Sequence, residues 1–227
     1  MKDAVGGVAW RPLLALLLVV WFCRSGVAAE RPNVVFLLAD DLGYADCGFN
    51  GGTEIRTPHL DKLAAAGAVL EDFYVQPVCS PTRAALMTGR YPMRLGLQVG
   101  VIRPWANYGL DLEERLLSVA LREGGYRTAI CGKWHLGSFD PAYWPHSRGF
   151  DHSYGHLFGA IDYFTHIREG QVDWFRNGER LNEEGYTTHL LAKEAVKFVE
   201  QQSAEQAVLP VCPVQRGSHA AASAGLL

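Results

Sequence analysis

The stretch "NVVFLLADD", residues 33–41, decides the fold because a continuous apolar run ends in two carboxylates. The run lacks the polar–apolar alternation of a strand with one wet face, so we expect a strand buried on both faces of a parallel sheet. Gly43 permits the chain to turn directly after Asp40 and Asp41. Ligands of open α/β sheets bind at the carboxyl ends of the strands. The stretch therefore predicts an α/β protein with a site at these aspartates.

Further helices and strands alternate along the chain. Thr57-Pro58 and Ser80-Pro81 both place a capping residue before a proline, the pattern of a helix start, and Gly67 and Gly89 end those helices. The other expected elements are strands at 68–75 and 127–131, helices at 116–122 and 188–202, and an aromatic, irregular rim of loops or small hairpins at 138–182. This order predicts a mixed, largely parallel sheet flanked by helices.

The N-terminal residues 1–29 have the pattern of a secretory signal peptide. Lys2 and Arg11 supply positive charge, Leu13 to Phe22 is an apolar run of ten residues, and small residues stand before Glu30. The run is too short to span a bilayer, although an uncleaved anchor remains the alternative. We therefore expect a chain that enters the secretory pathway and is free of the membrane after cleavage.

The charge of the chain argues against nucleic acid as a partner. The 227 residues carry 21 Lys and Arg against 24 Asp and Glu, a net charge of −3. Removal of residues 1–29 takes away three basic residues and one acidic residue, which leaves 18 minus 23, or −5. A mildly acidic chain without a basic run does not attract a polyanion.

Three segments place reactive groups where strands end or a helix begins. Asp40-Asp41 offers hard oxygens for Ca²⁺ or Mg²⁺, or is a solvated acidic turn. Lys133 and His135 can face one anion, or be a surface lysine beside a histidine bonded to backbone. Cys79 stands at a helix N-terminus with Arg83 one turn on, where positive potential favours an anion or thiolate.

Cys79 has several readings from these residues alone. A disulfide with Cys47 or Cys131 is one, since an oxidising compartment permits pairing, and a thiolate nucleophile is another. The longer pattern is more specific. Cys79-x-Pro81-x-Arg83, continued as Ala-Ala-Leu-Met-Thr-Gly-Arg90, resembles the signature of the type I sulfatases, which are arylsulfatase-like enzymes. Four further segments resemble that family in the same order: "RPNVVFLLADDLGY" (31–44), "TPHLDKLAAAG" (57–67), "GYRTAICGKWHLG" (125–137) and "RGFD" (148–151).

The resemblance implies a fold, a cofactor and a set of roles. The fold would be that of the alkaline-phosphatase-like sulfatases, and Cys79 would be oxidised to Cα-formylglycine by the formylglycine-generating enzyme before folding. Its hydrate would attack the sulfur of an aryl or carbohydrate sulfate ester, and elimination would restore the aldehyde. Asp40, Asp41 and residue 79 would bind Ca²⁺ (or Mg²⁺), while Arg83, Lys133 and His135 would hold the diol and the sulfate. The protein would be secreted or lysosomal, or periplasmic in a bacterium.

The pattern departs from the family near residue 206. Pro210 and Pro213 interrupt the next apolar run, and proline removes donors from a central strand. We therefore expect residues 30–206 to form the N-terminal part of a sulfatase catalytic domain. We expect residues 207–227 to be an atypical tail, as a frameshift, retained intron or alternative splice would produce. Later metal and sulfate ligands of the family have no match, so the alternatives are an inactive truncated chain and a related phosphoesterase or phosphonate hydrolase.

Overall fold

The computed structural model describes residues 31–204 and 206–215. Contacts divide the chain into two units, Met1–Pro32 and Asn33–Leu227, and every element named below belongs to the second. The expected signal peptide, residues 1–29, lies outside the described residues. Within the described part of the chain, every helix is too short or too polar to cross a bilayer.

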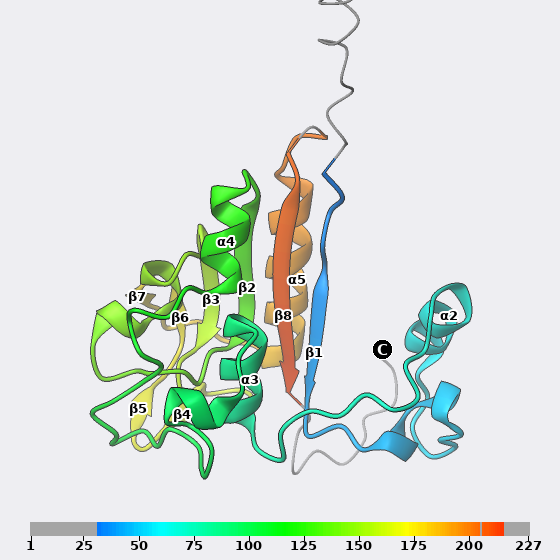
Figure 1. Ribbon diagram of the computed structural model, residues 1–227, viewed down its shortest axis with the longest axis horizontal. Coiled ribbons are helices and arrows are strands. Elements are labelled where there is room, and N and C mark those ends of the chain that lie inside the picture. The colour runs from blue at the N-terminus through cyan, green and yellow to red at the C-terminus, as the bar shows by residue number, and fades with distance from the viewer. Residues whose placement is uncertain (1–30, 205, 216–227) are drawn as a thin grey trace, which may run out of the picture. The chain divides into compact units, whose positions relative to one another are not determined.

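A six-stranded sheet forms the centre of the second unit (Figure 1). Its strands, in spatial order, are β1 (Phe36–Asp40), β8 (Val208–Gln215), β2 (Arg127–Lys133), β3 (His152–His156), β6 (Phe175–Arg176) and β7 (Glu179–Arg180). The first four are mutually parallel, whereas β6 and β7 join antiparallel. The predicted mixed, largely parallel sheet is confirmed.

Helices cover both faces of this sheet. Ile130 packs in a core with Ala84 and Met87 of α3, while the next residue, Cys131, packs with Leu191 of α5. Successive strand residues point to opposite faces, so α3 and α5 lie on opposite sides. The helices that flank the sheet are α3 (Cys79–Thr88), α4 (Leu117–Glu123) and α5 (Thr187–Glu200), whereas α2 (Pro58–Ala66) lies away from the sheet and packs against the turn Gly48–Asn50 (Figure 1). All four were predicted to within about two residues, the usual uncertainty of helix ends.

Short elements fill the connections. They are the hairpin of β4 (Ile167–Arg168) and β5 (Gln171–Val172) and the 3₁₀ turns Tyr44–Asp46, Gly48–Asn50, Pro92–Leu95, Pro141–Tyr143 and Pro145–Ser147. The rim predicted at 138–182 is therefore largely irregular and contains two small hairpins, β4–β5 and β6–β7, but it also contributes β3, β6 and β7 to the main sheet. Polar and glycine residues in "HSYGH" concealed β3.

The expectation that the fold ends at residue 206 is wrong for residues 208–215. This segment is β8, which pairs with β1 on one side and β2 on the other. Val208, Leu209 and Val211 are almost completely buried. Burial of one such side chain stabilises by about 1.5–3 kcal/mol, whereas a lost backbone hydrogen bond costs about 0.5–1.5 kcal/mol, so the apolar content outweighs the two prolines. Residues 216–227 lie outside the described part.

Gly132 shows how closely β8 lies against β2. Its φ is 144°, and a Cβ built on it would stand 2.3 Å from the carbonyl oxygen of Pro213. Only glycine meets both conditions. The "CGK" of β2 therefore contains a glycine because the backbones of β2 and β8 approach each other there.

The strand expected at 68–75 is not formed. Leu70, Phe73 and Tyr74 are 70%, 68% and 83% exposed, and the segment joins α2 to α3 without strand pairing. Its apolar residues pair with neither edge strand of the sheet, so apolar content alone did not make this segment a strand. The sequence pattern therefore misassigned this connection.

One side of the sheet remains uncovered by the described residues. β1 pairs there with β8 alone, and Val35 and Leu37 are 57% and 54% exposed. They line a groove of about 420 Å³ whose other walls come from α5 and β8; further lining residues include Leu191, Val196, Val199, Pro210 and Cys212. We call this the α5–β1 groove.

Candidate active site

Three elements bring the predicted site residues to one end of the sheet. β1 ends at Asp40, β2 ends at Lys133, and α3 begins at Cys79. β8 lies between β1 and β2, so the two strands reach the same edge with one strand between them (Figure 1). This is the carboxyl edge at which parallel α/β sheets bind ligands.

A buried cluster of three charges forms the floor of the site. Oδ2 of Asp40 accepts hydrogen bonds from Nη2 of Arg83 at 2.5 Å and from Nζ of Lys133 at 2.8 Å. Nη1 of Arg83 donates to the carbonyl oxygen of Lys133 at 2.5 Å. The three side chains are 8%, 5% and 3% exposed. Two cations against one carboxylate leave a net positive charge, which suits an anion.

The ionised form of Asp40 is held by these neighbours. Burial raises the pKa of Asp40, but the charges of Arg83 and Lys133 and their hydrogen bonds outweigh burial, so the pKa lies below its usual value. Burial lowers the pKa of Arg83 despite the opposing charge of Asp40. Asp40 therefore stays ionised at neutral pH.

Cys79 faces His135. Sγ of Cys79 lies 3.1 Å from Nδ1 of His135, and Nε2 of His135 lies 2.8 Å from the carbonyl oxygen of Ile102. A carbonyl oxygen only accepts, so Nε2 carries the proton and Nδ1 presents a lone pair to residue 79. Ser80 fixes this loop, because its Oγ donates to the carbonyl oxygen of His135 and accepts from the backbone N–H of Ile102.

The imidazole of His135 is neutral near pH 7. Burial, and then the charge of Lys133, lower the pKa of His135 to about 3. The group that faces residue 79 is therefore a neutral hydrogen-bond acceptor and not an imidazolium. Cys47, Cys79, Cys131 and Cys212 are all free thiols in the described residues, so the disulfide reading of Cys79 gains no support.

Asp41 and the metal hypothesis stand apart from this cluster. Asp41 is exposed and has a φ of 62°, the turn that Gly43 had suggested. No three His, Cys, Asp or Glu side chains gather as a metal site anywhere in the described ranges 31–204 and 206–215. Asp40 already serves two cations, and Ca²⁺ takes 6–8 oxygens. The described residues alone do not fit a Ca²⁺ ion.

Two residues near the site were missed from the sequence. Tyr163 has a buried hydroxyl without a hydrogen-bond partner among the described residues, and burial, Tyr186 and the charges of Asp40 and Asp41 raise its pKa to about 12. His156 ends β3 in register with Lys133. The rim holds several histidines of similar context, so only the pairing of β3 with β2 singles out His156.

Comparison with known proteins identifies the chain. The family model for Sulfatase matches residues 32–225. The chain belongs to the sulfatase family. It is 47% identical to Arylsulfatase J of Mus musculus over 146 residues, which are 64% of this chain and 24% of that protein. It is 34% identical to N-acetylgalactosamine-6-sulfatase of Mus musculus over 218 residues, which are 87% of this chain and 42% of that protein. Human Arylsulfatase A is 46% identical over 142 residues, 61% of this chain and 27% of that protein.

Solved sulfatase structures share the fold. A crystal structure of Ps i-CgsB in complex with k-i-k-neocarrahexaose superposes with a TM-score of 0.76 at 36% identity, covering 85% of this chain and 46% of that chain. The PsFucS1 sulfatase from Pseudoalteromonas sp. gives a TM-score of 0.68 at 27% identity, with 92% and 48% coverage. The chain thus spans less than half the length of these relatives. The match through residue 225 also counts against a foreign segment starting at 207.

Proposed function

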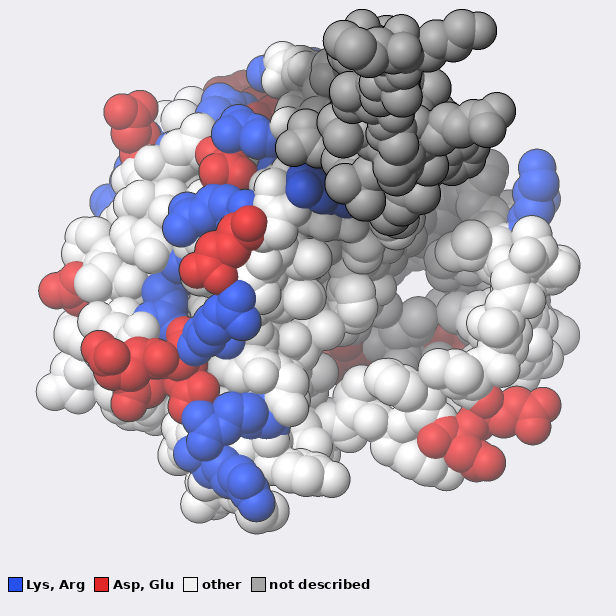
Figure 2. All heavy atoms as spheres, turned by 45° about the horizontal axis from the view of Figure 1, so that its top comes forward, with Lys and Arg blue, Asp and Glu red and all other residues white. Residues whose placement is uncertain are grey.

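We propose that this sulfatase-family chain carries the nucleophile and anion-binding part of a sulfate ester hydrolase acting on aryl or carbohydrate sulfates. The observation that carries the proposal is the buried cationic pair, Arg83 and Lys133, beside a Cys79 that faces a neutral acceptor on His135. In Figure 2, basic and acidic side chains are interleaved on the visible face. The cations that would select a small anion are instead buried, where their field is less screened.

We propose that Cys79 is converted to Cα-formylglycine by the formylglycine-generating enzyme of the secretory pathway. The surroundings fit that group, because a hydroxyl at residue 79 would find the Nδ1 lone pair of His135 where Sγ now lies, at 3.1 Å. The hydrated aldehyde would supply an oxygen nucleophile toward sulfur. Such a protein would be secreted or lysosomal, or periplasmic in a bacterium.

The side chains would then divide the work. His135 would accept a proton from the attacking hydroxyl at Nδ1 while Ile102 keeps its Nε2–H in place. Arg83 and Lys133 would bind the sulfate oxygens and stabilise the charge that develops on them. Both cations now bond to Asp40, so Asp40 holds them at the fixed positions that an incoming sulfate would use.

The proposed metal contribution of this chain is limited to Asp40, Asp41 and residue 79 as oxygen ligands of Ca²⁺ (or Mg²⁺). These three are too few for a Ca²⁺ site, so the division of work above uses protein side chains alone. The same shortage favours the alternative that this chain by itself is catalytically inactive. A chain that binds sulfate but does not turn over an ester would support that alternative.

Two measurements test the proposal. Mass spectrometry of the tryptic peptide 63–83, from protein made in a secretory host, should show an aldehyde at residue 79. Turnover of an aryl sulfate should be lost in Cys79→Ala and retained in Cys212→Ala, a control at another free cysteine. An unmodified thiol at residue 79, or equal turnover by the two variants, would overturn the proposed function. Phosphate monoesters and diesters tested in parallel would identify a phosphoesterase.

A further inference from the structure

Besides the hydroxyl of Tyr163, two buried nitrogen atoms near the site lack a hydrogen-bond partner among the described residues. They are Nε of Arg83 and Nε2 of His156. Arg83 is 4% exposed and His156 is 2% exposed, so bulk water does not satisfy either atom. A guanidinium nitrogen is always a donor, whereas an imidazole nitrogen can be an acceptor. Buried polar groups without partners are rare and call for an explanation.

The tautomer of His156 is set by its other nitrogen. Nδ1 lies 2.9 Å from the carbonyl oxygen of Phe158, which only accepts, so Nδ1 carries the proton and Nε2 is an acceptor. Asp173 fixes the turn that contains this carbonyl, since it accepts from the backbone N–H groups of Leu157 at 3.1 Å and Phe158 at 2.7 Å. Burial, and then the charges of Lys133 and Arg83, lower the pKa of His156 to about 3, so the ring is neutral.

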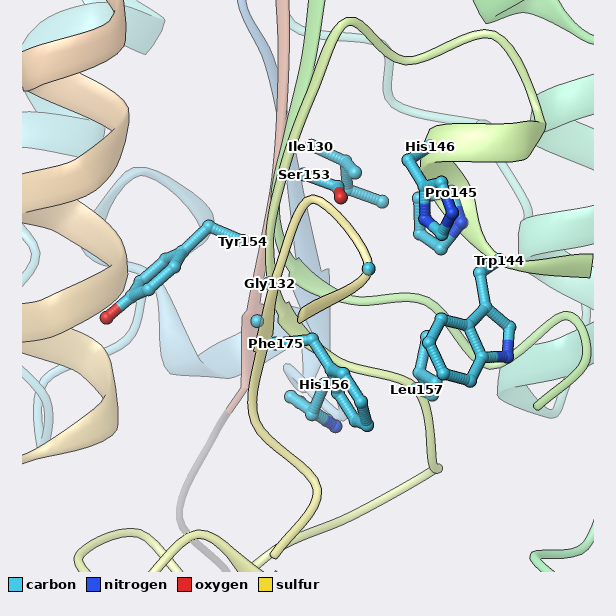
Figure 3. A pocket seen from close by; sticks show the side chains of 12 residues that line it. Ile130, Gly132, Trp144, Pro145, His146, Ser153, Tyr154, His156, Leu157 and Phe175 are labelled. Carbon is cyan, nitrogen blue, oxygen red and sulfur yellow. The ribbon is translucent and has the colours of Figure 1, made fainter. Parts of the chain in front are cut away.

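Arg83 and His156 both lie next to Lys133, the last residue of β2. His156 is in register with Lys133, and the N–H of Trp134 donates to the carbonyl oxygen of His156 at 2.9 Å. Nη1 of Arg83 donates to the carbonyl oxygen of the same Lys133, and Nη2 donates to Asp40. Figure 3 shows His156 at the end of its strand, among the residues that line a small buried cavity. Nε–H is thus the donor of Arg83 that still needs an acceptor.

We propose that His156 is a positioning residue of the anion site, whose Nε2 accepts a hydrogen bond from one buried water molecule that in turn accepts the Nε–H of Arg83. This water bridge would fix the third nitrogen of the guanidinium, after Asp40 and the Lys133 carbonyl have fixed the other two. Arg83 would then present one orientation to an anion. This inference deepens the proposed function and rests on it only for the identity of the anion as sulfate.

Nuclear magnetic resonance on the ¹⁵N-labelled full chain tests the water bridge without any activity. The wild-type protein should show His156 as the Nδ1–H tautomer and a slowly exchanging Arg83 Nε–H signal, assigned by its loss in Arg83→Lys. His156→Leu should speed exchange of that proton at least about tenfold, because the acceptor that holds the water molecule is gone. His156→Gln, which keeps an acceptor oxygen, should restore slow exchange.

His166→Leu is the matched control. His166 is also buried and its Nε2 has no partner among the described residues, but its ring stacks on Trp174, with ring centroids 4.4 Å apart, in the core beside α5 and not beside Arg83. Its loss should leave Arg83 Nε–H exchange unchanged. An Nε2–H tautomer at His156, or equal exchange in His156→Leu and wild type, would overturn the inference.

Titration with inorganic sulfate separates the inference from the proposed function. Sulfate should bind His156→Leu about tenfold more weakly than wild type, and should bind His156→Gln and His166→Leu with nearly wild-type affinity. If sulfate binds no form of the protein while Arg83 exchange still depends on His156, the positioning role stands and the proposed function fails. If sulfate binds all forms equally, the positioning role fails.

Discussion

The proposed anion site and the α5–β1 groove lie on the same sheet but differ in how far the described residues bury them. At the site, Asp40, Arg83 and Lys133 are buried and bonded to one another. In the groove, Val35 and Leu37 stand more than half exposed on a strand whose outer side is unpaired among the described residues. The charged side chains of the site are therefore buried, whereas the apolar side chains of the groove are exposed.

The difference teaches which part of a sulfatase this chain builds by itself. The side chains of the proposed anion site come from β1, α3 and β2, which pack together within the described residues. The groove is open on one side, and the proposed metal ligands Asp40, Asp41 and residue 79 are too few for a Ca²⁺ ion. Stability should therefore depend strongly on the site and weakly on the groove.

The largest effect should come from breaking the buried charge cluster. Arg83→Met leaves Asp40 with one cation and the Lys133 carbonyl without its donor, which should cost about 3–5 kcal/mol of unfolding free energy. Urea denaturation measures it. The control is Arg115→Met, whose pair with Glu123 is 66% and 59% exposed and should cost less than about 1 kcal/mol. Equal losses of unfolding free energy in the two variants would show that the buried charge cluster contributes no more to stability than an exposed ion pair.

The next largest effect should be a loss of unfolding free energy at acidic pH. The folded-state pKa values of His135 and His156 are about 3, below the ordinary 6.5, so the unfolded state binds more protons below pH 6.5. Stability should fall between pH 6.5 and 3 by up to about 1.4 kcal/mol per pH unit for each histidine. Asp40, with a lowered pKa, keeps its contribution above its unfolded pKa near 3.8 and loses it only as the pH falls further.

Urea midpoints between pH 7 and 4.5 check this slope. A His135→Gln, His156→Gln double variant should show a flatter dependence, since it lacks both titrating groups. A double variant that follows the wild-type slope would show that other groups dominate the acid response.

A substitution where β2 and β8 approach each other should have an intermediate effect on the free energy of unfolding. Gly132→Ala would place a Cβ 2.3 Å from the Pro213 carbonyl oxygen at a φ of 144°, and should cost about 2 kcal/mol or more. Gly51→Ala shares a positive φ of 90° but meets no atom within 4 Å, so it should cost only about 1 kcal/mol. Thermal denaturation compares the two. Similar losses of stability in the two variants would mean that the positive φ causes the whole effect, and that the close approach of β8 to Gly132 contributes nothing.

The smallest effect should come from the groove. Leu37→Asn replaces a side chain that is 54% exposed and should change the unfolding free energy by less than about 0.5 kcal/mol, while lowering the fluorescence of a bound apolar dye. Leu209→Ala, at a fully buried position of β8, should cost about 2–5 kcal/mol. A large loss from Leu37→Asn would mean that the groove is closed in solution.

The sequence predicted which side chains come together at the site, but it did not predict His156 or the strand β8 between β1 and β2. Cys79, Asp40 and Lys133 were predictable because each stands at a helix start or strand end, where parallel topology gathers side chains. His156 was not, because its partners depend on the register of β3 with β2. β8 was misjudged because proline content was weighed without the burial that a central position provides.

The position of β8 sets the order in which the sheet can form. Among the described residues β1 joins the rest of the sheet through β8 alone, and the backbone N–H of Val208 donates to the side chain of Asn33 across 175 positions of sequence. At translation rates of roughly 5–20 residues per second, β1 waits on the order of 10–35 s for its neighbour. During that interval Asp40 has no strand to hold it beside Arg83 and Lys133. The closing of the charge cluster is therefore a late event in the life of the nascent chain, and the segment around Cys79 stays open to other proteins until then.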